Sequence, residues 1–259
     1  MAPILRKKEI LSALSESGML SVSDLAAQLD VSEMTIRRDI SKLEEEGLVA
    51  KHQGAIELLE TNSLSKLINE PSRDKKETLF HDEKVYIASL AVEEISEGMT
   101  IYLDAGTTTL EIAKQLAFNR VFQDLTIITN DFVIAMLLIQ HSEYVLYHTG
   151  GRIDRENQSC VGEQTANALA GLHITKAFVS SSSWDSSGIT TPSESKIAVK
   201  RAIISSSRHC YLVTDSSKYN SAALFKICSL SVFDKIYTDQ SISTKAIEDI
   251  QLHDVQLIN

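Results

Sequence analysis

Short apolar segments alternate with helical patterns over residues 85–258, and this alternation constrains the fold more than any other feature of the chain. The expected strands are 100–104 (TIYLD), 125–130 (LTIITN), 143–148 (EYVLYH), 176–181 (KAFVSS), 210–215 (CYLVTD), 234–239 (DKIYTD) and 255–258 (VQLI). Helical periodicity lies between most of them, notably over 107–117, 131–140, 162–171, 194–206 and 244–252. Because strands separated by helices usually run parallel, the pattern predicts an α/β domain with a mainly parallel sheet.

A smaller, α-rich module precedes this domain. Helical patterns cover residues 5–17, 22–29 and 33–46, and residues 48–58 are typical of a short hairpin that turns at Gln53 and Gly54. Ser21 and Asp24 have the spacing of a capping box, and Ser32 is a good N-cap for the third helix. A polar stretch follows, with mixed charge and one proline. We therefore expect a module over 1–59, a linker over 60–84 and the α/β domain over 85–259.

The third helix, within VSEMTIRRDISKLEEEG (31–47), carries two adjacent arginines. On a helical wheel of about 100° per residue, Ile36, Ile40 and Leu43 form the buried face. The opposite face carries Met34, Arg38, Ser41 and Lys42, flanked by Thr35 and Arg37. Its N-terminal half is cationic, as in the recognition helix of a helix-turn-helix that reads bases. A solvated amphipathic helix is the plainer interpretation of such charges, and spacing alone leaves both open.

The charge balance argues against a protein that coats nucleic acid non-specifically. The chain has a net charge of -10, and residues 1–60 contain seven basic and eleven acidic side chains. Acidity of the whole chain does not exclude a local cationic face. Any recognition of DNA must therefore depend on a few well-placed groups.

Polar and glycine-containing segments follow several of the expected strands. They are LDAGTTT (103–109), TND (129–131), HTGGR (148–152), GITTP (188–192) and TDSSK (214–218). In open α/β sheets the ligand binds beyond the carboxyl ends of the strands, and helix N-termini there attract anions. Hydroxyl groups combined with lysine or arginine suit a phosphorylated polyol. Threonine capping of a helix, and lysines that are simply solvated, remain the plainer alternatives for each segment alone.

The run from Arg6 to Ala55 resembles the winged helix-turn-helix of the DeoR family of bacterial transcriptional regulators, most distinctively in VSEMTIRRDISKLEEEG. The resemblance implies that the third helix enters the major groove and that the hairpin is the wing. It implies base or phosphate contacts from Thr35, Arg37 and Arg38. It further implies backbone contacts from Ser32 and Lys42, with Lys51 and His52 flanking the wing.

Residues 75–258 resemble the effector domain of the same family, whose fold is similar to ribose-5-phosphate isomerase. The matching segments are LDAGTTT, TIITN, TGGR, VKRAI and DSSK. The resemblance implies a phosphorylated sugar as effector, surrounded by Asp104, Gly106, Thr107, Thr108, Asn130, Gly150, Gly151 and Lys218. The segment 177–192 departs from the common family pattern, so we expect Ser180–Ser183 and Trp184 to reshape one wall of the site.

The favoured hypothesis is a sequence-specific DNA-binding regulator, most simply a repressor of a carbohydrate catabolic operon that a phosphorylated sugar releases or modulates. Reading two half-sites requires at least a dimer, so operator DNA, the effector and a second copy of the chain are the expected partners. The alternative is an isomerase-like enzyme with a DNA-binding head. The acids nearest the polar segments are Asp104, Asp185 and Glu194, and their spacing does not demand catalysis.

Composition favours neither a cofactor nor a metal. The three cysteines form no CxxC pair, and the seven histidines are scattered without ligand spacing. The N-terminus lacks the apolar core of a signal peptide, and the longest apolar run, 132–139, is too short to cross a bilayer. We therefore expect a cytoplasmic protein with no catalytic site, cofactor, metal or membrane partner.

Overall fold

A computed structural model describes residues 3–45, 48–52, 55–58, 70–119, 122–253 and 255–259. The chain divides into two compact units. The first comprises residues 1–70 with 221–224, and the second comprises 71–220 with 225–259. Each is described by itself below.

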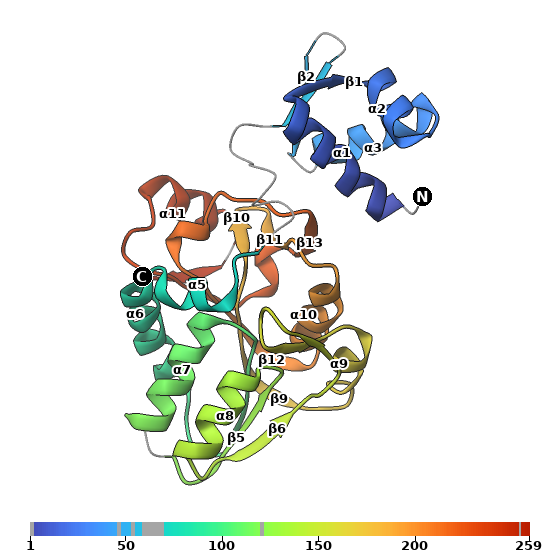
Figure 1. The fold of residues 1–259 in the computed structure, drawn as a ribbon. Helices are drawn as coiled ribbons and strands as arrows, with labels where there is room; N and C mark the ends of the chain where they lie inside the picture. Colours follow the sequence, from blue (N-terminus) through green and yellow to red (C-terminus); the bar gives the residue numbers. More distant parts are fainter. Residues whose placement is uncertain (1–2, 46–47, 53–54, 59–69, 120–121, 254) are drawn as a thin grey trace. The chain divides into compact units, whose positions relative to one another are not determined.

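The first unit is a winged helix-turn-helix, as the sequence predicts (Figure 1). Three helices, α1 (Pro3–Ser17), α2 (Val22–Leu29) and α3 (Glu33–Glu45), accompany a three-stranded antiparallel sheet in the order β1-β3-β2. The strands are β1 (Met19–Ser21), β2 (Val49–His52) and β3 (Ala55–Leu58). The expected hairpin is β2–β3, and its turn at Gln53 and Gly54 lies outside the described residues. Strand β1, which pairs with β3, was not predicted.

Local sequence explains where α2 begins and ends. The Ser21 side chain accepts from the Asp24 N–H, and the Asp24 carboxylate accepts from the Ser21 N–H, which completes the predicted capping box. Asp30 adopts a left-handed conformation (φ 51°) and terminates the helix. The helices then pack through buried apolar side chains that include Leu14, Leu25 and Ile36.

The second unit contains a seven-stranded sheet in the order β15-β14-β12-β9-β4-β5-β6, and every pairing in it is parallel. The strands are β4 (Met99–Leu103), β5 (Leu125–Thr129), β6 (Val145–His148), β9 (Ile174–Val179), β12 (Ser207–Val213), β14 (Lys235–Tyr237) and β15 (Gln256–Ile258). Each overlaps one of the expected strands. The prediction of an α/β domain with a mainly parallel sheet is therefore confirmed.

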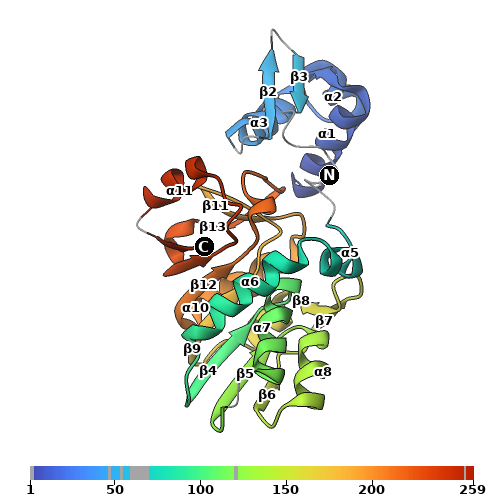
Figure 2. The ribbon, with the colours of Figure 1, turned by 90° about the vertical axis from the view of Figure 1, so that its left-hand side faces the viewer.

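Helices cover both faces of this sheet (Figures 1 and 2). Helices α6 (His81–Ala91), α7 (Thr107–Phe118) and α8 (Phe132–His141) pack on one face around a cluster that includes Ile87, Ile112 and Leu138. Helices α10 (Ser195–Ser205) and α11 (Thr244–Gln251) contribute to the cluster on the other face, and α9 (Glu163–Asn167) packs against α10. This arrangement leaves the carboxyl ends of the strands for the loops that precede the helices.

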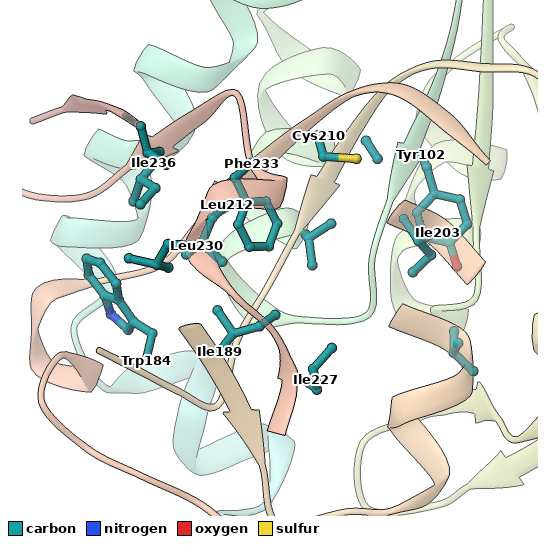
Figure 3. Close-up of a cluster of buried hydrophobic side chains, with 14 of the residues drawn as sticks. Tyr102, Trp184, Ile189, Ile203, Cys210, Leu212, Ile227, Leu230, Phe233 and Ile236 are labelled. Carbon is teal, nitrogen blue, oxygen red and sulfur yellow. The ribbon is translucent and has the colours of Figure 1, made fainter. Parts of the chain in front are cut away.

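Trp184 lies inside the second cluster rather than on the wall of a site, contrary to expectation (Figure 3). Its side chain is fully buried, packs edge-on against Tyr219 and directs Nε1 toward the Asp215 carbonyl at 3.4 Å. It belongs to β10 (Ser183–Asp185), which forms a small antiparallel sheet with β11 (Gly188–Thr191) and β13 (Phe225–Cys228). A large apolar ring is stabilised more by burial in this cluster than by exposure at a polar site.

The expected linker over 60–84 differs from the structure. Residues 71–84 belong to the second unit and form α5 (Arg73–Thr78) and the start of α6, whereas 59–69 lie outside the described residues. The polar composition suggested a linker, but Arg73 and Lys84 are only 3% and 2% exposed. Charged side chains can be buried when they are paired, and local composition does not reveal their partners. The hairpin of β7 (Arg152–Asp154) and β8 (Ser159–Val161) was also not predicted.

Candidate functional site

The outer face of α3 matches the helical-wheel prediction. Arg37, Arg38 and Lys42 are exposed, and Met34 is 81% exposed. The two arginines differ in environment, because Arg37 Nη2 donates to Glu33 Oε2 at 3.0 Å. Arg38 and Lys42 make no ion pair with another described residue. They are therefore the most available cations on this face.

Ser32 and Thr35 lie together at the beginning of α3. Their hydroxyl groups are 2.9 Å apart, and the Thr35 N–H approaches Ser32 Oγ at 3.3 Å. The Ser32 carbonyl also accepts from the Ile36 N–H at 3.1 Å, so Ser32 caps the helix as predicted. This places two hydroxyl groups at the helix terminus that favours anions.

In the wing hairpin, the charge of Lys51 is neutralised by an acidic side chain of α3. Lys51 Nζ in β2 donates to Glu44 Oε2 at 2.5 Å, and both side chains are more than two-fifths exposed. His52 follows in β2, but its side chain lies outside the described part of the chain. Of the two residues expected to flank the wing, Lys51 is thus held against the far end of α3.

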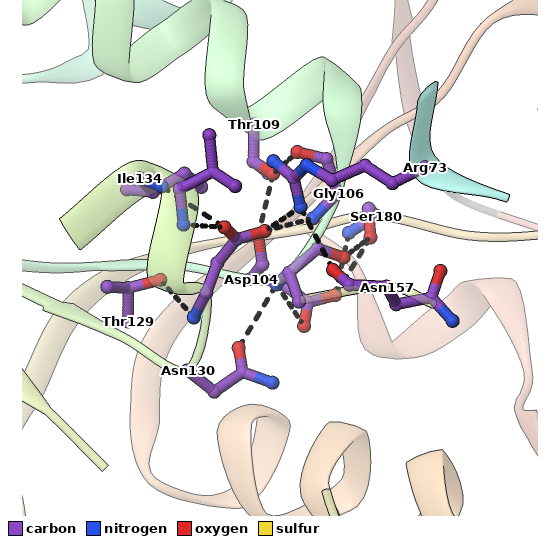
Figure 4. A network of polar contacts seen from close by, with 12 residues as sticks. Arg73, Asp104, Gly106, Thr109, Thr129, Asn130, Ile134, Asn157 and Ser180 are labelled. Atoms are coloured by element: carbon purple, nitrogen blue, oxygen red, sulfur yellow. Dashed lines mark hydrogen bonds and ion pairs between the residues drawn. The ribbon is translucent and has the colours of Figure 1, made fainter. Parts of the chain in front are cut away.

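At the carboxyl ends of the sheet, Asp104 is held in a buried ion pair with Lys200. Figure 4 shows Ser180 beside the same carboxylate. This carboxylate accepts from Lys200 Nζ, from the Ser180 N–H at 3.0 Å and from Ser180 Oγ at 3.1 Å. The Ala105 N–H donates to the other oxygen at 2.9 Å. Asp104 therefore joins β4 to the end of β9 and to α10, and its oxygens are well supplied with donors.

Asn130, the second polar residue of the expected set, also has internal partners. Its Oδ1 accepts from the Tyr102 hydroxyl at 2.9 Å and from the Ala105 N–H at 3.1 Å, while Nδ2 donates to the Cys160 carbonyl at 2.9 Å. The neighbouring Asp131 caps α8, since Oδ1 accepts from the Val133 N–H at 2.8 Å. Asn130 thus fixes the loop after β4 more than it offers groups to a ligand.

A second buried ion pair joins Asp131 to Arg73. Arg73 Nη1 lies 2.6 Å from Asp131 Oδ2, which also accepts from the Gly106 N–H at 3.2 Å. Burial raises the pKa of Asp131, and the Arg73 guanidinium opposes that effect. The pair ties α5 to the N-terminus of α7.

The remaining expected residues occupy neighbouring loops. Thr107 and Thr108 begin α7 and are 6% and 1% exposed. Gly151 has φ +120°, and a Cβ there would lie 2.1 Å from Thr165 Oγ1, so this position requires glycine. Gly150 precedes it with φ +64°, and Lys218 Nζ lies 3.1 Å from Asp215 Oδ2. The expected set is therefore gathered at the carboxyl-terminal edge, beyond β4, β5, β6 and β12.

Buried polar atoms without a hydrogen bond to another described residue concentrate at this edge. They include Arg73 Nε and Nη2, Thr108 Oγ1, His148 Nε2, Thr149 Oγ1 and Thr238 Oγ1. Such atoms are rare in protein interiors. Their clustering beyond strand ends is typical of a ligand site in an α/β sheet.

Two buried lysines, Lys84 and Lys200, bring positive charge to the carboxyl-terminal edge of the sheet. Lys200 pairs with Asp104, and Lys84 Nζ donates to the Lys76 carbonyl and to the Leu79 carbonyl, the latter at 2.5 Å. Burial, together with the nearby positive charge of Lys218, lowers the pKa of Lys84 to about 8. The segment VKRAI (199–203) is a sequence signal for Lys200, whereas the polar composition around Arg73 and Lys84 predicts only a linker.

The three acids nearest the polar segments of the sequence do not form a catalytic arrangement. Asp104 is paired as described, Asp185 Oδ1 accepts from the Ser187 N–H at 2.8 Å, and Glu194 is exposed. Among the described residues, no group of three or more His, Cys, Asp or Glu side chains could hold a metal. Within the same residues, no helix is long and apolar enough to cross a membrane.

Family models match both units. The model for a DeoR-like helix-turn-helix domain matches residues 6–62, and the model for the DeoR C terminal sensor domain matches residues 79–240. A solved ribose 5-phosphate isomerase A from Methanocaldococcus jannaschii covers 54% of this chain and 55% of its own, at 16% identity and a TM-score of 0.39. Likeness at that level carries no weight for the fold or the function.

Full-length relatives bear regulator names. A transcriptional regulator of Haemophilus influenzae described as HTH-type is 48% identical and covers 99% of this chain and 97% of its own. The HTH-type transcriptional regulator YgbI of Escherichia coli K12 is 43% identical and covers 100% and 98%. The glycerol-3-phosphate regulon repressor of the same organism is 30% identical and covers 97% of each. These names are those of regulators and not of enzymes, and the chain belongs to the DeoR family of DNA-binding transcriptional regulators.

Proposed function

We propose that the chain represses a carbohydrate-use operon and that a phosphorylated sugar modulates its binding to operator DNA. The observation that supports an effector is the set of buried polar atoms at the carboxyl edge of the sheet that have no hydrogen bond to a described residue. Relatives named as repressors of the glycerol-3-phosphate regulon, the aga operon and the lactose phosphotransferase system support the operon class.

For DNA, Arg38 and Lys42 are the foremost contacts, because both are exposed on the outer face of α3 and make no ion pair with another described residue. Arg37 exchanges its pairing with Glu33 for a phosphate or base. The hydroxyl groups of Ser32 and Thr35 suit the DNA backbone, since phosphates accept hydrogen bonds at helix N-termini. Lys51 and His52 remain the proposed contacts of the wing.

Six residues at this edge contact the effector in our proposal, either by donating hydrogen bonds or by letting the ligand approach the backbone closely. They are Gly106, Thr107, Thr108, Gly150, Gly151 and Lys218. Asp104 and Asn130 act mainly by holding the loop after β4, since Lys200, Ser180 and Tyr102 already engage them. A phosphorylated ligand suits the edge, because the N-terminus of the twelve-residue helix α7 points there and buried cations lie beside it.

The domain division follows from these roles. Residues 1–59 are the proposed DNA-binding part, and the α/β domain over 85–259, together with α5, binds the effector and joins copies of the chain. Operator half-sites lie about 34 Å apart, so reading both requires two heads and at least a dimer. Light scattering of the purified protein tests this, and a monomer that binds operator with full affinity contradicts it. A repressor of transcription acts in the cytoplasm, so we propose that location for the protein.

The decisive experiment is a thermal-shift screen of sugar phosphates, followed by operator binding with and without each hit. We expect at least one phosphorylated sugar to raise the melting temperature and to change operator affinity. The unphosphorylated form of the same sugar is the matched control and should do neither. If no sugar phosphate alters operator binding, the effector half of the proposal is wrong, whereas the DNA-binding half stands or falls with operator binding itself.

A further inference from the structure

We propose that Arg73 grips the anionic group of the effector and thereby couples occupancy of the site to the segment that leads to the DNA-binding unit. This inference rests on the proposed function, because it assigns a regulatory residue to the same site. Arg73 was absent from the residues that the sequence pointed to.

The position of Arg73 in the chain is the first observation. It begins α5, two residues after the second unit starts at Pro71, and residues 59–69 connect that point to the winged helix-turn-helix. Its side chain is nevertheless 3% exposed and reaches the loops beyond β4 and β5. One residue thus lies both at the beginning of the second unit and inside its ligand edge.

The hydrogen bonds of the guanidinium are the second observation. Nη1 uses its donors on Asp131 Oδ2 at 2.6 Å and on the Asn157 carbonyl at 3.1 Å. Nε and Nη2 are buried and make no hydrogen bond with any other described residue. These two nitrogens form one edge of the planar group, which is an edge that binds oxyanions with two parallel hydrogen bonds. The unused edge therefore suits a phosphate or carboxylate.

The surroundings supply an independent third observation. Asp131 Oδ2, the partner of Arg73, also accepts from the Gly106 N–H at the start of α7 (Figure 4). Thr108 in the first turn of that helix is 1% exposed, and its Oγ1 has no hydrogen bond to a described residue. An anion bound at this terminus would meet the Arg73 edge, the Thr108 hydroxyl and the positive end of the helix.

The contacts of α5 give the coupling a physical basis. The helix has only six residues, and polar contacts fasten it: Lys76 Nζ donates to Asn157 Oδ1, and Lys84 caps its last turn through the Leu79 carbonyl. A ligand that adds two hydrogen bonds to Arg73 favours the docked state of α5 over any other. Because residues 59–72 lead along the chain from the winged helix-turn-helix to α5, the anchor point of the DNA-binding unit then depends on effector occupancy.

Three variants separate ligand binding from a purely structural ion pair. Arg73→Lys keeps a cation for Asp131 but lacks the Nε–Nη2 edge. Asp131→Asn keeps a cap for α8 and frees Arg73 from its competing carboxylate. Lys75→Gln removes an exposed cation from the same helix and is the matched control.

Inorganic phosphate is the probe, measured by thermal shift and by calorimetric titration of the full chain. We expect Arg73→Lys to weaken phosphate binding about tenfold or more, which corresponds to the loss of hydrogen bonds to a charged group. Asp131→Asn should bind phosphate at least as tightly as the wild type, and Lys75→Gln should not differ from it. Equal weakening in Arg73→Lys and Asp131→Asn, wild-type binding by Arg73→Lys, or no binding of phosphate to the wild type would each overturn the proposal.

The coupling is tested with operator DNA and a sugar phosphate that shifts wild-type operator affinity. Arg73→Lys should lose the response, so that its operator affinity is the same with and without the sugar phosphate, whereas the control Lys75→Gln should respond as the wild type does. If the wild type responds and Arg73→Lys responds equally, the role of Arg73 is refuted while the proposed function survives. If the wild type responds to no sugar phosphate, the proposed function itself fails.

Discussion

At the scale of single residues, two neighbouring arginines show why charge alone does not identify a contact. Arg37 is paired with Glu33 one turn earlier, at 3.0 Å, whereas Arg38 has no such partner among the described residues. A surface pair of this kind stabilises the helix by only a few tenths of a kcal/mol. Arg37 can therefore give up its ion pair with Glu33 for a DNA contact at a small cost in free energy. Arg38 has no ion pair with a described residue to give up.

We expect Arg38→Ala to weaken operator binding by ~1–3 kcal/mol if the guanidinium contacts a base in a bidentate manner. Fluorescence anisotropy with a labelled operator duplex measures the change. Arg208→Ala, which removes an exposed arginine from the second unit, is the control and should have no effect. A loss that is equal for operator and random DNA would make Arg38 a phosphate contact, and unchanged affinity would exclude it from the interface.

At the scale of elements, buried charges hold helices and strands in register. Arg6 of α1 and Asp39 of α3 form an ion pair at 2.5 Å with side chains 10% and 5% exposed. On a helical wheel Asp39 falls toward the edge of the buried face of α3, and that position does not reveal Arg6 as its partner. Hydrogen bonding to Asp39 raises the pKa of Arg6, so the guanidinium stays charged.

Breaking this pair should destabilise the first unit. Asp39→Ala removes the carboxylate that accepts from Arg6 Nε, and removal of one partner from a buried pair costs about 3–5 kcal/mol. The double variant Arg6→Met/Asp39→Leu replaces the pair with apolar packing and should recover most of the loss. Differential scanning calorimetry of the full chain checks this, and a double variant as unstable as the single one would contradict it.

The carboxylate of Glu94 joins three strands of the sheet. Its oxygens accept from Lys235 Nζ and Tyr237 OH, both at 2.6 Å, from Lys176 Nζ at 2.9 Å and from Tyr211 OH at 3.1 Å. Burial disfavours the charge, but these hydrogen bonds and the lysine charges prevail and lower the pKa of Glu94 from 4.5 to about 2. The ionised form is therefore part of the folded state.

A depressed pKa of an acid stabilises the fold above the ordinary value, and the stabilisation is lost as pH falls. For Glu94 we expect stability to decline between pH 4.5 and about 2. Glu94→Gln should be less stable near neutral pH and should show a flatter decline in that window. Urea unfolding at several pH values measures both, with the exposed Glu143→Gln as control. An unchanged pH profile in Glu94→Gln would contradict the assignment.

At the scale of the whole molecule, one chain carries a DNA-binding unit and a sensor unit, matched by residues 6–62 and 79–240. If an effector and operator DNA bind the same chain, as we propose, their affinities must obey thermodynamic linkage. If the effector weakens operator binding by some factor, the operator must weaken effector binding by the same factor.

We expect the two factors to agree and to lie between about 5 and 150. Calorimetric titration of the effective sugar phosphate, with and without saturating operator duplex, gives one factor, and operator titration gives the other. A scrambled duplex is the control and should leave effector affinity unchanged. Unequal factors would show that a further species, such as a change of oligomeric state, takes part in the equilibrium.

The local sequence determined many elements of both units, although not β1, β7, β8 or α5, because periodicities of 2 and 3.6 are properties of neighbouring residues. It therefore predicted the seven parallel strands and the exposed face of α3. Only the tertiary structure decided how the buried charges pair. Arg73 meets Asp131 across 58 positions, and Lys200 meets Asp104 across 96. A polar segment gives no local sign that its charges will be neutralised by partners so far away. For that reason the sequence alone predicts a linker over the segment that contains Arg73.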